Sequence, residues 1–230
     1  SVVVHTAAET NVDRCETEQD HARSVNVDGT SNIANACLRA RAKLIFISTD
    51  YVFDGHKGNY AEMDEPNPIS FYGFTKLEAE RIVASTLSTS LIIRPSVLYG
   101  WHPRKLNFGT WILKGLRERQ TLKVVNDHIN SPTFADNLAC AIRKAIDCKS
   151  QGVLHIAGSE RISRFDFARR MAKRFGLDER LLVPVSMSDL NWVARRPRDS
   201  SLNVGKAEKE LGIQPFGVDR GLEEMARTEP

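Results

Sequence analysis

The sequence predicts an α/β fold in which helices cover both faces of a parallel sheet. Short, continuous apolar runs occupy residues 1–4, 43–48, 91–94 and 152–156, as expected of strands that are buried on both faces. The segments between them carry apolar residues three and four positions apart, which is the spacing of one helix face. Because the two patterns alternate along the chain, we expect parallel strands joined by crossover helices.

The individual elements follow in chain order. After the strand at 1–4, apolar and small residues from Ala22 to Ala40 form one stripe and predict a single helix before the strand at 43–48. Further helices are predicted at residues 72–83, 108–119, 136–146 and 165–175, and further strands at 91–94, 122–125, 152–156 and 181–185. Ser163 with Asp166 resembles a capping box that opens the helix at 165–175.

Composition excludes several classes of protein. The 230 residues are 41% hydrophobic and 27% charged with a net charge of +3, which fits a folded globular protein. Neither half forms a basic pole, and no apolar stretch approaches the roughly 20 residues that cross a bilayer. We therefore expect no nucleic-acid or membrane partner and a cytoplasmic location. The four cysteines form no C-x-x-C pair and the histidines lack metal-ligand spacing, so we expect reduced structural thiols and no metal site.

The strongest candidate for chemistry is the pair Tyr72 and Lys76, preceded by Thr49 at the end of an apolar strand. Residues i and i+4 share one helix face, so the phenol and the ammonium can address the same ligand. A tyrosine has a pKa of about 10, and a nearby cation lowers it toward the pH at which the phenol exchanges a proton. The Thr49 hydroxyl can donate a hydrogen bond to a carbonyl oxygen. The same spacing is also found where a surface lysine lies beside a half-buried tyrosine.

Three longer motifs share one resemblance. Residues 49–55 (TDYVFDG), 72–80 (YGFTKLEAE) and 94–100 (RPSVLYG) resemble the extended short-chain dehydrogenase/reductases, and within them the dTDP-4-dehydrorhamnose reductase family. The similarity continues through residues 126–128, 131–133, 195–198 and 202–203, so it covers essentially the whole chain. It departs at Val97, where that family usually has a tryptophan over the sugar, and this leaves the choice of sugar open.

The resemblance implies a reduction in which NADPH delivers a hydride to the C4 ketone of the nucleotide sugar dTDP-4-dehydrorhamnose, while Tyr72 supplies the proton. NADH is the alternative cofactor. The resemblance further implies that Thr49 polarises the ketone, and that Lys76 lowers the pKa of Tyr72 and holds the nicotinamide ribose. These roles agree with those inferred from the residue types alone.

The same resemblance implies a set of binding residues. Those contacting the cofactor, besides Tyr72 and Lys76, would be Thr6, Ala7, Ala8, Thr10, Ser96 and Leu98. The substrate would contact Asp50 and Tyr51 through its sugar, and Asn107 and Arg196 through its diphosphate, since a guanidinium can bind two phosphate oxygens. Arg196 also fits a solvated basic turn. Asn26 fits either a buried structural hydrogen bond or a proton relay.

The pattern of elements also divides the chain near residue 160, because the predicted elements become shorter and more irregular after it. Residues 1–160 are expected to form a Rossmann-like domain with a doubly wound parallel sheet, and residues 161–230 mainly a small lobe that binds the nucleotide sugar. No G-x-G-x-x-G turn opens the chain, and its first strand corresponds to the fourth strand of the family. About 50–60 residues of such a domain are therefore expected to precede Ser1.

Two other functions stay open. Residues 50–55 and 195–198, together with His5, residues 7–9 and residues 26–28, also resemble the regulatory beta subunits of methionine adenosyltransferase. That resemblance implies a non-catalytic NADP-binding protein whose partner is the catalytic subunit. A nucleotide-sugar epimerase or dehydratase would use the same tyrosine and lysine with tightly held NAD. A homodimer is a further candidate assembly.

Overall fold

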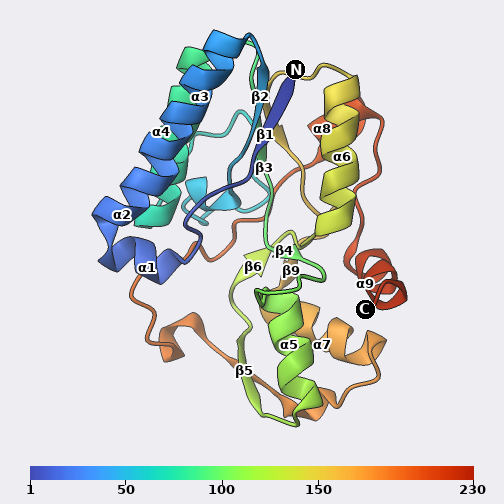
Figure 1. Cartoon of the computed structure of the whole chain (residues 1–230). Helices are drawn as coiled ribbons and strands as arrows, with labels where there is room; N and C mark the ends of the chain where they lie inside the picture. Colours follow the sequence, from blue (N-terminus) through green and yellow to red (C-terminus); the bar gives the residue numbers. More distant parts are fainter.

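The computed structural model describes residues 1–230 (Figure 1). Its central sheet has four parallel strands in the order β1, β2, β3, β8. The bounds are β1 (Val2–His5), β2 (Lys43–Ile47), β3 (Leu91–Arg94) and β8 (Gly152–His155). The parallel sheet predicted from the continuous apolar runs is confirmed.

Helices cover both faces of this sheet, as predicted. Figure 1 shows α3 and α4 on one side of the strands and α6 and α8 on the other. Their bounds are α3 (Gly29–Ala40), α4 (Phe71–Thr86), α6 (Ala135–Asp147) and α8 (Gly205–Leu211). Successive strand side chains point to opposite faces. Leu44 and Phe46 of β2 therefore pack with α3 and α4, whereas Ile45 packs with α6 and α8.

The single helix predicted for residues 22–40 is wrong in one respect. The segment contains the end of α2 (Gln19–Arg23), a π-helical turn at Ser24–Asp28, and then α3; the short helix α1 (Val12–Thr17) precedes them. A π turn inserts an extra residue into the helical repeat, which an apolar stripe does not reveal. The turn carries Asn26 inward, where it is 1% exposed.

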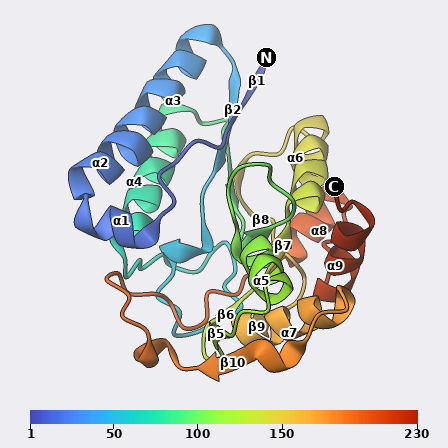
Figure 2. The same cartoon turned by 60° about the horizontal axis from the view of Figure 1, so that its bottom comes forward.

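A second layer lies beyond the carboxyl ends of the sheet strands, at the bottom of Figure 1 and toward the viewer in Figure 2. Here β5 (Leu122–Val125) pairs in parallel with β10 (Leu182–Val185) instead of joining the central sheet. Its core packs α5 (Phe108–Arg117), α7 (Arg164–Arg174) and α9 (Val218–Arg227) around buried side chains such as Phe167 and Met171. Elements from both sides of residue 160 thus build this layer.

Short strands connect the two layers. β4 (Leu98–Tyr99) runs parallel to β7 (Thr133–Phe134), and β6 (Ile129–Asn130) runs antiparallel to β9 (Ile162–Ser163). Single 3-10 turns occur at Asp50–Val52, Glu179–Leu181 and Met187–Asp189. Ser163 caps α7 as predicted, because its hydroxyl accepts a hydrogen bond from the Asp166 amide at 3.0 Å. None of the helices has both the length and the hydropathy needed to cross a membrane.

Candidate functional site

A cleft of about 620 Å³ opens where β1, β2 and β3 end. Ligands of parallel α/β sheets bind at this edge, outside the carboxyl ends of the strands. The opposite wall comes from residues 97–107 and the first residue of α7. Ten of the thirteen predicted site residues line the cleft: Thr6, Ala8, Thr10, Thr49, Asp50, Tyr51, Tyr72, Lys76, Leu98 and Asn107. Ala7, Ser96 and Arg196 are not among the lining residues.

Tyr72 lies in the first turn of α4. Ser70 begins this helix by accepting a hydrogen bond from the Gly73 amide at 3.2 Å. The Tyr72 ring packs edge-on against Tyr51, with 5.9 Å between the ring centroids. Burial raises the pKa of Tyr72 well above its usual value, and the neighbouring Thr49 hydroxyl opposes this rise. The phenol is therefore protonated at neutral pH and is able to donate a proton.

Lys76 lies one turn further along α4, and only 2% of it is exposed. Its Nζ donates a hydrogen bond to the Ile47 carbonyl oxygen at 2.7 Å and lies 4.1 Å from the centre of the Phe46 ring. Burial lowers the pKa of Lys76 to about 7, while the Glu80 carboxylate opposes the fall. The predicted lowering of the Tyr72 pKa by Lys76 is not found, because the amine turns toward β2 and burial dominates the titration of the phenol.

Asp50 is held in place by hydroxyl groups from three parts of the chain. Its Oδ2 accepts hydrogen bonds from Ser200 at 2.5 Å and Ser96 at 2.8 Å, and its Oδ1 from Thr49 at 3.2 Å. Burial raises the pKa of Asp50, and these hydrogen bonds oppose the rise. Ser96 is 1% exposed and therefore supports Asp50 from behind rather than lining the cleft.

The loop after β1 carries Thr6, Ala8 and Thr10 into the lining of the cleft. Asn26 anchors this loop, because its side chain exchanges hydrogen bonds with the Glu9 backbone at 2.8 and 3.1 Å. The amide also donates to Thr75 on α4 at 3.0 Å. Of the two roles considered for Asn26, the structure contains the buried structural hydrogen bonds.

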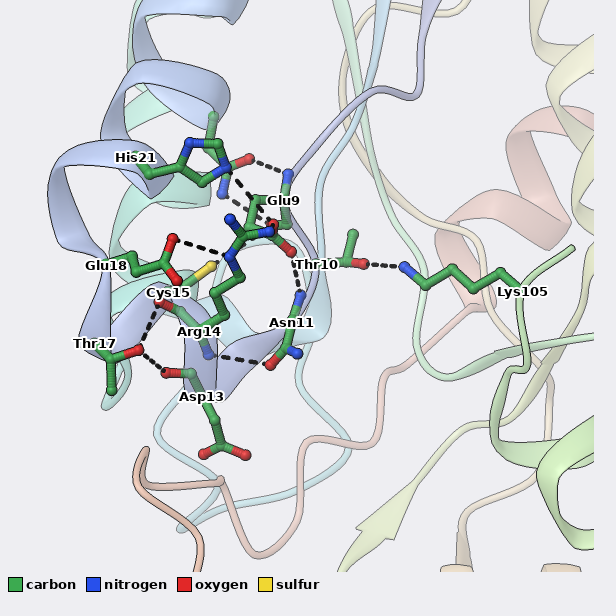
Figure 3. A network of polar contacts seen from close by, with 11 residues as sticks. Glu9, Thr10, Asn11, Asp13, Arg14, Cys15, Thr17, Glu18, His21 and Lys105 are labelled. Carbon is green, nitrogen blue, oxygen red and sulfur yellow. Dashed lines mark hydrogen bonds and ion pairs between the residues drawn. The ribbon is translucent and has the colours of Figure 1, made fainter.

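A contact spans the mouth of the cleft. Lys105 reaches across from the opposite wall, and its Nζ donates a hydrogen bond to the Thr10 hydroxyl at 3.0 Å (Figure 3). The same figure shows the Glu9 carboxylate bonded to the Asn11 amide and paired with Arg14, at 2.9 and 3.2 Å. The loop after β1 is thus tied both to the N-terminal helices and across the cleft.

Arg196 is committed to another partner. Its guanidinium forms a two-pronged ion pair with Asp13 of α1, with N–O distances of 2.6 and 2.7 Å, and donates to the Ala194 carbonyl oxygen at 2.6 Å. It also stacks on the Trp192 ring at 4.6 Å. Asn107 lines the cleft, but both ends of its side-chain amide are engaged. The oxygen caps α5 by accepting a hydrogen bond from the Thr110 backbone amide, and the nitrogen donates to the Gly100 carbonyl oxygen at 2.7 Å.

Several lining residues were not predicted from the sequence. Trp101, His102, Lys105 and Arg164 all lie in the wall opposite the sheet. Residues 101–105 follow the conspicuous motif at 94–100, and this proximity was the only available signal. Arg164 stands directly after the capping Ser163, where it looks like an ordinary helix-starting residue.

The cleft offers small side chains and hydroxyls at the ends of β1 and β2, and a tyrosine with a lysine on the adjacent helix. The buried Ser48 hydroxyl in its lining has no hydrogen-bond partner. No group of three or more His, Cys, Asp or Glu side chains could hold a metal ion. The arrangement favours a ligand with hydroxyl groups and an acceptor for the Tyr72 proton.

Comparisons with known proteins find one family and relatives with two different names. The model of the family described as RmlD substrate binding domain matches residues 1–229. dTDP-4-dehydrorhamnose reductase of Aggregatibacter actinomycetemcomitans is 33% identical over 237 residues, covering 98% of this chain and 80% of that protein. Methionine adenosyltransferase 2 subunit beta of Bos taurus is 34% identical over 227 residues, covering 94% of this chain and 67% of that protein.

A solved structure resembles this chain over nearly its whole length. The crystal structure of dTDP-4-dehydrorhamnose reductase from Bacillus anthracis, determined in complex with NADP, superposes with a TM-score of 0.94 and 32% identity. The match covers 99% of this chain and 80% of that chain.

Proposed function

This chain belongs to the RmlD substrate binding domain family, and on that premise we propose that it is an NADPH-dependent oxidoreductase that reduces the ketone of a nucleotide sugar. The observation that carries the proposal is that Thr49, Tyr72 and Lys76 line the same cleft at the carboxyl edge of the sheet. The relative from Bacillus anthracis, whose structure contains NADP, supports NADPH over NADH as the cofactor.

The residues present fit a dinucleotide. Small side chains at the end of β1, Thr6 and Ala8, leave room in the cleft, and the unpartnered Ser48 hydroxyl is available to a ligand. Lys76 uses one of its N–H donors on the Ile47 carbonyl oxygen, so its remaining donors would hold the ribose hydroxyls. When bound, NADPH supplies the hydride for the reduction.

Tyr72 would donate the proton that the reduced oxygen requires. The phenol is protonated at neutral pH, so the acid is present when the oxygen becomes negative. Thr49 would donate a hydrogen bond to the same oxygen and orient the ketone. Asp50 and Tyr51, beside them in the lining, would contact the sugar.

We propose dTDP-4-dehydrorhamnose as the substrate, which rests on similarity to proteins named for that activity. NADPH oxidation should be followed with this sugar, and Tyr72→Phe should lower turnover by at least about 100-fold, the usual scale for a general acid. Tyr60→Phe is the matched control, because the Tyr60 hydroxyl lies outside the cleft, 2.6 Å from Asp54, and turnover should persist.

Two results would contradict the proposal in different ways. A folded Tyr72→Phe protein with turnover within a few-fold of the unaltered enzyme would show that Tyr72 is not the acid. If the unaltered protein binds NADPH but turns over no nucleotide sugar, the reductase function itself is refuted.

A second candidate is a subunit role, favoured by similarity to methionine adenosyltransferase 2 subunit beta. In that case the cleft would bind the dinucleotide without catalysis, and a methionine adenosyltransferase catalytic subunit would be the partner. Co-purification with such a subunit and a change in its kinetics would support this role. Turnover of a nucleotide sugar that depends on Tyr72 would exclude a purely non-catalytic protein.

A further inference from the structure

One arginine in the wall of the cleft has no acidic partner. Arg164 begins α7 and lines the cleft, as Asn107 and Trp101 also do. Its Nε is buried without any hydrogen-bond partner, and its guanidinium forms no ion pair with a carboxylate. The guanidinium lies 4.6 Å from the centre of the Phe108 ring and interacts with the Tyr51 hydroxyl.

The other cations near the cleft are already engaged. Arg196 is neutralised by Asp13, Lys105 donates to the Thr10 hydroxyl, and Lys76 donates to a strand carbonyl oxygen. Arg164 is therefore the cation of this cleft that pairs with no carboxylate and keeps its Nε donor free for a ligand. Its planar fork suits two oxygens of a single oxyanion.

The neighbours of Arg164 locate it at the Asp50 and Tyr51 end of the cleft. Its positive charge opposes the burial-driven rise in the pKa of both Asp50 and Tyr51, so it lies close to these two side chains. Burial lowers the pKa of Arg164 itself, Tyr51 and Asp50 oppose the fall, and repulsion from Arg196 adds to it. A buried cation without a counter-ion is unfavourable, and an anion from the ligand would relieve this.

We propose that Arg164 binds an oxyanion of the substrate, and that it, rather than Arg196, is the principal anion-recognition residue of the cleft. The identity of the substrate as a nucleotide sugar rests on the proposed function. Two sources share the required chemistry: the diphosphate of the nucleotide, and a carboxylate on the sugar.

The test compares Arg164→Gln and Arg164→Lys with the unaltered protein by titration calorimetry. Arg169→Gln is the matched control, because Arg169 is on the same helix, outside the cleft, and paired with Glu179. Three probes are used: thymidine, dTDP and a dTDP-hexuronate. Removing one partner of a buried charged contact typically costs about 2–5 kcal/mol of binding free energy. Arg164→Gln should therefore lower the affinity for an anionic probe by at least about 30-fold.

The probes distinguish the two sources of the anion. Weaker binding of dTDP with unchanged binding of thymidine would assign Arg164 to the diphosphate. Unchanged binding of dTDP with weaker binding of the dTDP-hexuronate would assign it to a sugar carboxylate. Arg164→Lys should be intermediate, because a lysine keeps the charge but loses the fork.

The proposal is overturned if Arg164→Gln binds all three probes as tightly as the Arg169→Gln control does, or if the unaltered protein binds none of them. The proposed function fails separately. If nucleotide binding depends on Arg164 but no NADPH is oxidised with any nucleotide sugar, the reductase is refuted and the anion site stands.

Discussion

Replacing Lys76 with methionine should stabilise the folded protein, although it removes a residue assigned to the site. Lys76 is 2% exposed, and its amine has a single hydrogen-bond acceptor, the Ile47 carbonyl oxygen. Methionine is similar in length, carries no charge and can occupy the same space over the Phe46 ring. The burial cost of the ammonium is absent from the variant.

The size of this effect follows from the pKa of Lys76, which burial lowers from 10.5 to about 7. Below pH 7 the lysine is charged in both states, and each pKa unit corresponds to about 1.4 kcal/mol, so the full cost of burial is about 5 kcal/mol. Between pH 7 and 10.5 the folded lysine is neutral while the unfolded lysine keeps its proton. The unfolded state then binds more protons, and the free energy of unfolding rises with pH.

The expected gain in the free energy of unfolding for Lys76→Met is therefore about 5 kcal/mol at pH 5, about 4 at pH 7 and about 2 at pH 9. Guanidinium denaturation of both proteins at these three pH values measures it. Using the difference between the two proteins cancels the contributions of the buried tyrosines and cysteines.

Lys123→Met, at an exposed lysine of β5, is the control and should show no such pH dependence. A Lys76→Met gain that is the same at pH 5 and pH 9, or a loss of stability at pH 7, would refute the reasoning. The variant should also lose NADPH turnover, since methionine cannot donate to a ribose hydroxyl.

Three further changes test other parts of the structure. In the unaltered protein the Arg94 guanidinium pairs with the Glu80 carboxylate at 2.6 and 2.9 Å, and Glu80→Gln leaves it buried beside a neutral amide. The free energy of unfolding should fall by about 3–5 kcal/mol, which would lower the melting temperature by about 6–20 °C. A fall under 2 °C in a circular dichroism melt would contradict this. Gly73→Ala places a Cβ against the Tyr51 carbonyl oxygen, so α4 must shift, and both the melting temperature and the turnover should fall. If neither value changes, the backbone accommodates the added Cβ and the reasoning is wrong. Lys105→Met removes the hydrogen bond to Thr10 across the cleft. In stopped-flow measurements NADPH should dissociate about 2- to 10-fold faster, with little change in melting temperature. An unchanged dissociation rate would mean that this contact does not retain the cofactor.

The elements could be predicted from the sequence because burial on two faces leaves a clear pattern. Leu44, Ile45 and Phe46 are all fully buried, and a continuous apolar run is what such a strand requires. The run at 122–125 looks similar, yet β5 pairs with β10, which lies about 60 residues further along the chain. An apolar run predicts a strand but not its partner, because pairing depends on the packing of α5 and α7 against it.

The site was predicted where chain position alone brings residues together. Thr49 lies two residues after the end of β2, and Tyr72 lies in the first turn of α4, which packs over that strand, so both reach the same edge. The effect of Lys76 on the Tyr72 pKa was predicted wrongly, because i to i+4 spacing fixes the helix face but not the direction of a long side chain. The Ile47 carbonyl oxygen, 29 residues away in sequence, decides that direction.

Arg164 and Arg196 show why residue type cannot assign an anion site. Both are arginines near polar motifs, and Arg196 stands in the more conspicuous one. Its partner Asp13 lies 183 residues away in sequence, so nothing local reveals that its charge is neutralised. Arg164 follows a capping serine, and no acidic residue reaches its buried Nε. Since a guanidinium recognises a ligand with the donors that the fold leaves free, the anion contact is expected at the start of α7.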